Sequence, residues 1–229
     1  MEKIIEAFEM LLSMDKELVQ IISVTLRMSF FSTSISCLIG IPVGVFLVNS
    51  NFKGKNTVKK IFHTLMGLPP VVAGLIVYLL FTKYGVFGRF NLLFTVEIMV
   101  VAQCVLIIPI VVSLTQSVVS SGSKIIIETA KGLNLSKIKT DFLLVTQNKI
   151  PLISVVLTAF GRAIAEVGAV SLVGGNIQWK TRVMTTAIML ETNKGNFSFA
   201  LALGIILIFI SLLVNTLASF FTAKEDGND

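Results

Sequence analysis

The sequence predicts an all-α membrane protein, a polytopic bundle of about five transmembrane helices. Hydrophobic residues make up 54% of the 229 residues and charged residues only 14%, whereas soluble proteins average about 25% charged residues. The mean hydropathy of +0.88 agrees with this class. A membrane crossing needs about 20 apolar residues. Five runs qualify, at residues 21–48, 61–82, 92–114, 151–173 and 199–221.

The first 17 residues are predicted to form an amphipathic helix on the membrane surface. They contain five acidic residues and two lysines, with Ile4, Phe8, Leu11 and Leu12 at helical spacing. This charge favours neither a cleavable signal nor a sixth span. The predicted organisation is therefore a surface helix (1–17), a transmembrane domain (18–221) and a cytoplasmic tail (222–229).

The first three spans contain residues that shape helices. Gly40 and Gly44, spaced G-x-x-x-G, allow another helix to approach the first span closely. Pro69 and Pro70 remove two backbone donors inside the second span, which predicts a kink or break. The freed carbonyl groups need protein or water beside them, so this feature either serves packing or lines an aqueous path. Pro109 in the third span leads to the same expectation.

Between the third and fourth spans, at about residues 115–150, lies a charged amphipathic helix that a membrane bundle does not need. Two opposite arcs are predicted on it: polar Lys124, Glu128 and Lys131, and apolar Ile126, Ala130 and Leu133. Gly132 and Asn134 both suit a left-handed cap, and Ser136 suits the N-cap of a second helix from Lys137. Such a helix-turn-helix outside the bilayer indicates a contact surface for a soluble partner.

The fourth span combines small residues with charges. Gly161, Ala165 and Gly168 form a stripe that another helix can approach closely. Arg162 and Glu166 lie beside this stripe, four residues apart, and charges inside a membrane usually face a bundle interior or an aqueous path. The two residues are therefore expected to form either a structural ion pair or part of a pathway or gate.

The outer end of the fourth span is predicted to make a tight turn. Gly174, Gly175 and Asn176 can turn sharply and expose backbone amides. With Lys180 and Arg182 nearby, the turn would suit a passing oxyanion, although a plain surface turn fits equally well.

Lysines in the short loops predict the orientation by the positive-inside rule. One group follows the first span and the other follows the third: Lys53, Lys55, Lys59 and Lys60, then Lys124, Lys131, Lys137, Lys139 and Lys149. Both loops are expected in the cytoplasm, with the N-terminus outside and the C-terminus inside. This topology accounts for the net charge of +6, so no nucleic-acid partner is predicted.

The sequence contains few residues of the kinds that carry out catalysis. Cys37 and Cys104 fall inside predicted spans as small buried hydrophobes, and His63, the one histidine, falls at the end of a span. No metal constellation, Gly-rich phosphate loop or nucleophile–base set occurs in the sequence. No cofactor is expected, and a membrane-bound enzyme ranks low.

The segment from Glu128 to Asn134 resembles the EAA coupling loop of ABC importer permeases. Thr129 stands where the family has its first alanine, Asn134 stands at its glycine, and Pro151 comes about one helical turn late. A second block, at residues 160–169, 173–177, 181–183 and 185–188, is similar to permeases of tungstate and molybdate importers, and closest to the tungstate branch. Residues 67–75, 102–103 and 108–110 resemble the same branch.

The resemblance implies a permease subunit in the plasma (inner) membrane of a prokaryote, importing tungstate or the related molybdate. It would pair with a second copy, two cytoplasmic ATP-binding subunits and an extracytoplasmic oxyanion-binding protein, so that ATP hydrolysis occurs on another chain. The expected coupling residues are Glu128, Thr129, Ala130, Lys131, Gly132 and Asn134. The expected path or gate residues are Pro69, Pro70, Arg162, Glu166, Gly168, Gly174, Gly175, Asn176 and Arg182.

The alternative function is an ion-gradient-driven secondary transporter that works without an ATPase. Such a protein would be expected to show internal repeats and intramembrane carboxylates. The sequence contains no detectable repeat, and Glu97 and Glu166 are its only candidates for a proton relay.

Overall fold

The computed structural model describes residues 2–13 and 15–226, and every regular element within those ranges is helical. The elements, in chain order, are α1 (Glu2–Leu12), α2 (Lys16–Asn49), α3 (Lys55–Leu65), α4 (Pro70–Phe81), η1 (Gly88–Phe90), α5 (Val96–Gly132), α6 (Lys137–Gln147), α7 (Lys149–Ile164), α8 (Gly168–Gly174), α9 (Met184–Asn193) and α10 (Phe197–Asp226). The predicted tail, 222–229, therefore begins inside α10, and its last three residues lie outside the described ranges.

The long helices confirm the predicted fold class. Within the described residues, Lys16–Asn49, Val96–Gly132 and Phe197–Phe221 are long and apolar enough to cross a membrane. The number of candidate spans rises to five if two bent pairs, α3 with α4 and α6 with α7, each count as one span.

The second predicted span is broken where the prolines predicted. Helix α3 ends at Leu65 and α4 begins at Pro70, with a bend of 101° between them. Pro69 is the N-cap of α4 and Pro70 its first residue, a position where a missing N–H costs no helical hydrogen bond. Helix α5, in contrast, continues without a break through Pro109.

The fourth predicted span, 151–173, is not one helix. Helix α7 ends at Ile164, and the short helix α8 begins at Gly168. The carboxylate of Glu166 accepts a hydrogen bond of 3.1 Å from the N–H of Ala169, which satisfies an unpaired donor in the first turn of α8. The expectation of a continuous helix is wrong because Glu166 interacts with the backbone instead of extending a helical face.

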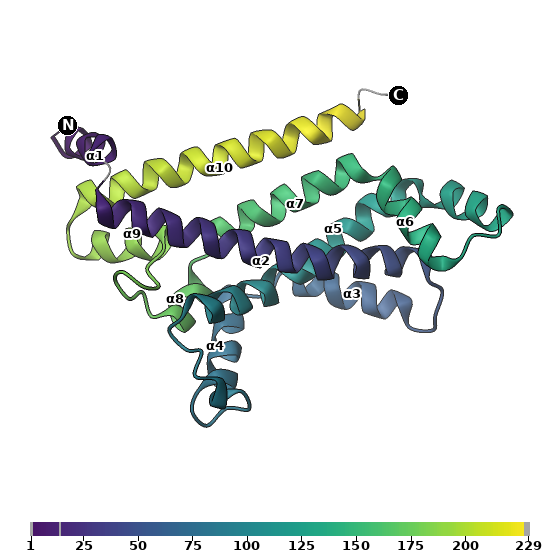
Figure 1. The fold of residues 1–229 in the computed structure, drawn as a ribbon, viewed down its shortest axis with the longest axis horizontal. Coiled ribbons are helices and arrows are strands. Elements are labelled where there is room, and N and C mark those ends of the chain that lie inside the picture. Colours follow the sequence, from purple (N-terminus) through teal and green to yellow (C-terminus); the bar gives the residue numbers. More distant parts are fainter. Residues whose placement is uncertain (1, 14, 227–229) are drawn as a thin grey trace. The chain divides into compact units, whose positions relative to one another are not determined.

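The N-terminal segment also divides earlier than expected. Helix α1 ends at Leu12 and α2 begins at Lys16, where Asp15 accepts backbone hydrogen bonds from Glu17 (2.8 Å) and Leu18 (3.1 Å) as an N-cap. Glu17 thus belongs to α2. Helix α1 lies beside the start of α10 (Figure 1), where Ser198 donates a 2.6 Å hydrogen bond to Glu6. The side chains of its predicted apolar face, Ile4, Phe8, Leu11 and Leu12, lie outside the described set.

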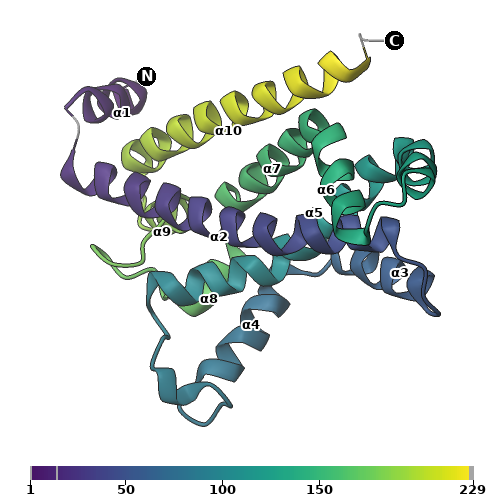
Figure 2. The ribbon, with the colours of Figure 1, turned by 45° about the vertical axis from the view of Figure 1, so that its right-hand side comes forward.

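The chain divides into two compact units. The first contains the residues up to Ser32, Pro69–Gln103 and Gly161–Leu213, and the second contains Thr33–Leu68, Cys104–Phe160 and the residues from Val214 onward. In the first unit α4 packs on α8 (Figure 2). A Cβ atom on Gly74 would lie 2.6 Å from the Cα atom of Ala169, so only glycine permits this backbone approach.

The second unit confirms the close approach predicted from Gly40 and Gly44. A Cβ atom on either glycine would lie 2.7 Å from a side-chain atom of α5, on Val111 and Thr115 respectively. Helix α2 therefore packs on α5 through its small residues. Buried apolar side chains from α2, α5, α6 and α7 complete this core: Val45, Val119, Leu144 and Leu152.

Candidate functional site

A cavity of about 570 Å³ in the first unit opens at the break between α7 and α8. Four of the predicted path residues line it: Pro70, Arg162, Glu166 and Gly168. The remaining lining residues are Val71, Ala165, Val167, Ser171, Leu172 and Met189. Residues that are far apart in the sequence, from the start of α4 and from the break between α7 and α8, thus meet at one cavity.

Glu166 and Arg162 do not form the ion pair that the sequence suggested. Glu166 is 6% exposed; its carboxylate bonds Ala169, and its backbone carbonyl accepts a 2.8 Å hydrogen bond from the hydroxyl of Thr185. Arg162 is exposed at the cavity. Within the described ranges, the ion pairs are Arg182 with Glu17 and Lys194 with Glu191. The ion pair predicted from the four-residue spacing does not form because α7 ends at Ile164, between the two residues.

Gln103 supports the end of α7 and was not among the predicted site residues. Its fully buried amide donates a 2.8 Å hydrogen bond to the carbonyl of Ala163 and accepts one of 2.6 Å from the hydroxyl of Ser32. The carbonyl groups of a last helical turn have no partner within the helix, so Gln103 satisfies one of them beside the break. The signal that could have identified Gln103 in the sequence is an amide side chain within an otherwise apolar run.

The turn after α8 is held by its own side chains. Gly175 and Asn176 have φ values of 69° and 50°. Thr181 donates a 2.6 Å hydrogen bond to the carbonyl of Gly174 and accepts one of 3.0 Å from the N–H of Ile177. The tight turn was thus predicted correctly, while its place on a path stays a prediction.

Arg182 forms a buried ion pair across the first unit. Its Nη1 atom lies 2.7 Å from Oε1 of Glu17, and the two side chains are 9% and 25% exposed. Glu17 was expected on a surface helix, so its contact with Arg182 was not predicted from the sequence. The guanidinium of Arg182 is already neutralised by a carboxylate, whereas that of Arg162 carries no ion pair to another described residue.

The helix-turn-helix between the third and fourth spans is confirmed. Asn134 has a φ of 51°, and the N–H of Leu135 donates a 2.9 Å hydrogen bond to the carbonyl of Ala130. Ser136 caps α6 by accepting from the N–H of Lys139 at 3.5 Å. The first helix of this segment is the continuation of α5, so the charged part and the membrane-crossing part are one uninterrupted helix.

The predicted polar arc of this segment is exposed, as expected. Lys124, Glu128 and Lys131 are exposed, and Ala130 on the opposite arc is buried. Leu133, predicted on the apolar arc, is 67% exposed because α5 ends at Gly132 and the helical periodicity stops there.

Exposed apolar side chains surround these charges. We call the region from Lys124 to Phe142 the coupling segment. Its large exposed hydrophobic residues are Ile125, Leu133, Ile138 and Phe142. A cleft of about 470 Å³ is lined by Lys124, Glu128, Lys131 and Lys137 together with residues at the end of α2. There Asn49 donates a 2.8 Å hydrogen bond to Asp141, which ties α2 to α6. Clustered exposed apolar residues are typical of a protein-binding surface.

Comparison with known proteins gives a consistent result. A model of the family described as "Binding-protein-dependent transport system inner membrane component" matches residues 38–225. The tungstate uptake system permease protein TupB of Peptoclostridium acidaminophilum is 37% identical over 99% of this chain and 100% of that protein. The TupB protein of Campylobacter jejuni is 39% identical over 92% of this chain and 88% of that protein.

A solved structure has the same fold. An inward-facing structure of the MetNI methionine ABC transporter matches with a TM-score of 0.74 and 17% sequence identity, over 92% of this chain and 97% of that chain. At this identity the match establishes the fold, and it confirms the all-α class.

Proposed function

Because the chain belongs to the family of binding-protein-dependent transport system inner membrane components, it is a multi-pass membrane transport subunit, and we propose that it is the permease of an ATP-driven importer for tungstate. Molybdate, a related oxyanion, is the next substrate to consider. The proposal of tungstate as the substrate rests on the two TupB relatives, each of which is similar over at least 88% of both chains.

The proposed assembly contains two copies of this chain, two cytoplasmic ATP-binding subunits and an extracytoplasmic oxyanion-binding protein. The exposed apolar residues of the coupling segment support a soluble partner on that side. A secondary transporter working alone has no need for such a surface, and the family match does not favour it. The loops rich in lysine then lie in the cytoplasm, with the N-terminus outside and the C-terminus inside.

In the proposed cycle, ATP binding closes the ATPases and the coupling segment transmits this movement to the spans. Glu128 and Lys131 are exposed on the coupling segment and can contact the ATPase directly. Thr129, Ala130, Gly132 and Asn134 shape the helix end that presents them. Since α5 is continuous, a displacement at Glu128 moves the transmembrane part of the same helix.

The proposed path includes the cavity at the break between α7 and α8. Arg162 provides an exposed positive charge there for a passing oxyanion, while Pro69 and Pro70 start α4 at the cavity wall. Glu166 and Gly168 belong to the break itself, where two helices can change their relative orientation. The turn at Gly174, Gly175 and Asn176 is proposed as the outer part of the path, and Arg182 as a residue that holds it.

The test is uptake into vesicles that contain this permease with its ATPase and binding protein. We expect ATP-dependent uptake of tungstate that molybdate inhibits and sulfate inhibits less. Calorimetric titration of the binding protein with the same three anions measures its selectivity among them, independently of the transport step. Uptake of none of these anions, with an assembled complex that hydrolyses ATP, would refute the proposed substrate class.

A further inference from the structure

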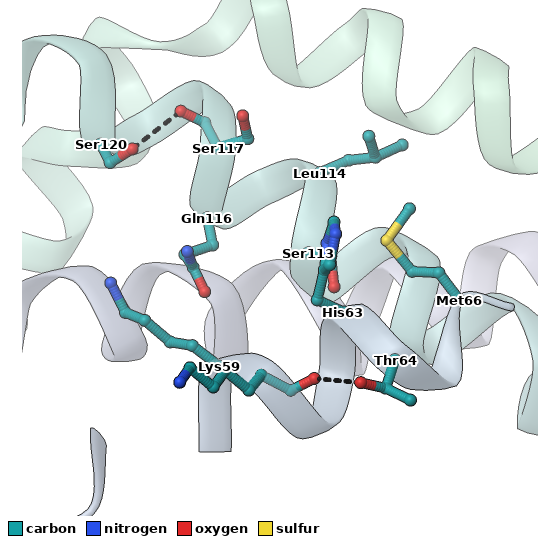
Figure 3. A pocket seen from close by; sticks show the side chains of 10 residues that line it. Lys59, His63, Thr64, Met66, Ser113, Leu114, Gln116, Ser117 and Ser120 are labelled. Carbon is teal, nitrogen blue, oxygen red and sulfur yellow. Dashed lines mark hydrogen bonds between the residues drawn. The ribbon is translucent and has the colours of Figure 1, made fainter. Parts of the chain in front are cut away.

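A cavity of about 580 Å³, to which several polar side chains contribute, lies within the second unit, between α3 and α5. From α3 and the residue that follows it, Lys59, Lys60, His63, Thr64 and Met66 line the cavity. Helix α5 contributes Ser113, Leu114, Gln116, Ser117 and Ser120. Figure 3 shows side chains of both helices at this cavity, among them Lys59 from α3 and Gln116 from α5.

The polar residues of α5 at this cavity share one face of the helix. Ser113, Gln116, Ser117 and Ser120 follow the i, i+3, i+4, i+7 spacing of a single helical stripe. This stripe lies on a helix that is otherwise apolar enough to cross a membrane. A lipid-facing helix has no need for such a row, so the stripe indicates a wet surface.

The charge of the cavity is positive. Lys59 and Lys60 contribute ammonium groups, and no carboxylate occurs among the described residues that line it. The two cavities described above differ in this respect, because Arg162 shares its cavity with Glu166 and the lysines of the coupling segment share theirs with Glu128. A cavity with cations and no counter-charge attracts anions.

Hydrogen-bond donors accompany the two cations. Gln116 offers amide N–H groups, and Ser113 and Ser117 offer hydroxyl groups. The Oγ atom of Ser113 is buried and has no hydrogen-bond partner among the described residues. Buried hydroxyl groups without a partner also occur among the described residues at Ser29, Thr33, Ser36 and Thr115. The donors within reach of an anion are therefore the amide of Gln116 and the hydroxyl of the exposed Ser117.

From this arrangement we infer that the cavity is a transient binding site for a tetrahedral oxyanion, beside the lysine-rich loop that is predicted to be cytoplasmic. The inference rests on the proposed import of an oxyanion and on the predicted orientation. A water molecule occupies about 30 Å³, so the cavity holds the anion together with many waters. Binding is therefore weak and rapidly reversible, as a site on a transport path requires.

A phosphate group of an anionic lipid has the same tetrahedral chemistry as the free anion. The two sources differ in one measurable way, since a headgroup site fills in an anionic membrane without added oxyanion. The experiment therefore needs membranes with and without anionic lipid.

The test uses the full permease in vesicles with a cysteine reporter, Met66→Cys, in a background without the native cysteines. Met66 lines the cavity but supplies none of its donors. In phosphatidylcholine vesicles, we expect tungstate to slow maleimide labelling of this cysteine in a saturable manner, and chloride at equal ionic strength to have no such effect. Ile138→Cys, exposed on α6 and away from the cavity, should label at the same rate with and without tungstate.

Charge removal provides the second part of the test. Lys59→Gln with Lys60→Gln should raise the half-protecting tungstate concentration about tenfold, or about threefold for each charge. Lys59→Arg with Lys60→Arg should retain protection. The matched control, Lys53→Gln with Lys139→Gln, removes the same charge from exposed positions outside the cavity and should leave protection unchanged.

Three outcomes would overturn the inference: no protection by tungstate, equal loss of protection in the control pair, or protection that appears only in membranes containing phosphatidylglycerol and that tungstate does not alter. Failure of the proposed function is a separate result, because it is read as absent uptake by the assembled wild-type importer. Normal tungstate uptake together with an unprotected Met66→Cys would overturn the site alone.

Discussion

Replacing Glu17 with Gln should destabilise the first unit by leaving Arg182 without its partner. Removing one member of a fully buried ion pair costs about 3–5 kcal/mol. The Glu17 side chain is 25% exposed and that of Arg182 is 9% exposed, so water reaches part of the site and we expect about 2 kcal/mol. For a chain of this size, this corresponds to a melting temperature lower by about 4–8 °C.

The reverse change should cost less. In Arg182→Gln the uncompensated charge is that of Glu17, the more exposed partner, and we expect a loss of about 1 kcal/mol. The double variant should be no less stable than Glu17→Gln alone, because no buried charge is left unpaired. Thermal stability in detergent, followed by size-exclusion chromatography, measures all three.

The control for this cycle is Lys180→Gln, which removes an exposed charge from the same loop and should change stability by less than about 0.5 kcal/mol. The reasoning is refuted if the losses of the two single variants simply add in the double variant. It is also refuted if Glu17→Gln melts within the error of the Lys180→Gln control.

Three further predictions concern topology, coupling and the path. A cysteine at Glu9 should react with an impermeant maleimide added outside, and one at Lys55 should not, because the acidic segment and the lysine loop are predicted to lie on opposite sides. Glu128→Lys should abolish ATP-driven uptake in vesicles without impairing membrane insertion, because it reverses an exposed charge at the proposed ATPase contact. The Arg162→Gln, Glu166→Gln double variant should not recover the uptake or the stability lost in either single variant, because the two residues form no ion pair.

Each of these predictions has its own contradicting result. The reverse labelling pattern would overturn the orientation. Wild-type uptake with Glu128→Lys would exclude Glu128 from coupling. Lys53→Glu, an exposed charge reversal outside the coupling segment, serves as its control. If the Arg162→Gln, Glu166→Gln double variant is more stable or more active than either single variant, the two residues do form an ion pair in the wild-type protein, against the structure.

The sequence was a good guide to features encoded within about ten neighbouring residues. Apolar runs indicated the spans, Pro69 and Pro70 the broken second span, and Asn134 with Ser136 the turn of the coupling segment. Each depends on local backbone chemistry, namely a missing donor, a left-handed residue or a capping hydroxyl. Local patterns of this kind are readable without knowledge of the packing.

Features that depend on distant contacts were missed or misread. Glu17 and Arg182 are 165 positions apart, so no spacing rule connects them. The break after Ile164 was missed because Glu166 looks like a helix former in sequence but bonds the backbone of Ala169 in the structure. The helical spacing of the polar residues from Ser113 to Ser120 is visible in the sequence. That they line a cavity together with lysines of α3 could be learned only from the structure.

The continuity of α5 has a thermodynamic consequence. Ser113 and Glu128 lie on one helix that continues without a break through Gly122, separated by about 22 Å at 1.5 Å per residue. If docking of the ATPase at Glu128 shifts the helix, the affinity of the cavity at Ser113 for its anion changes. Linkage is reciprocal, so the anion must change the affinity for the ATPase by the same factor. Occupancy of the cavity by the anion would therefore change, through a single helix, how strongly the ATPase binds this permease.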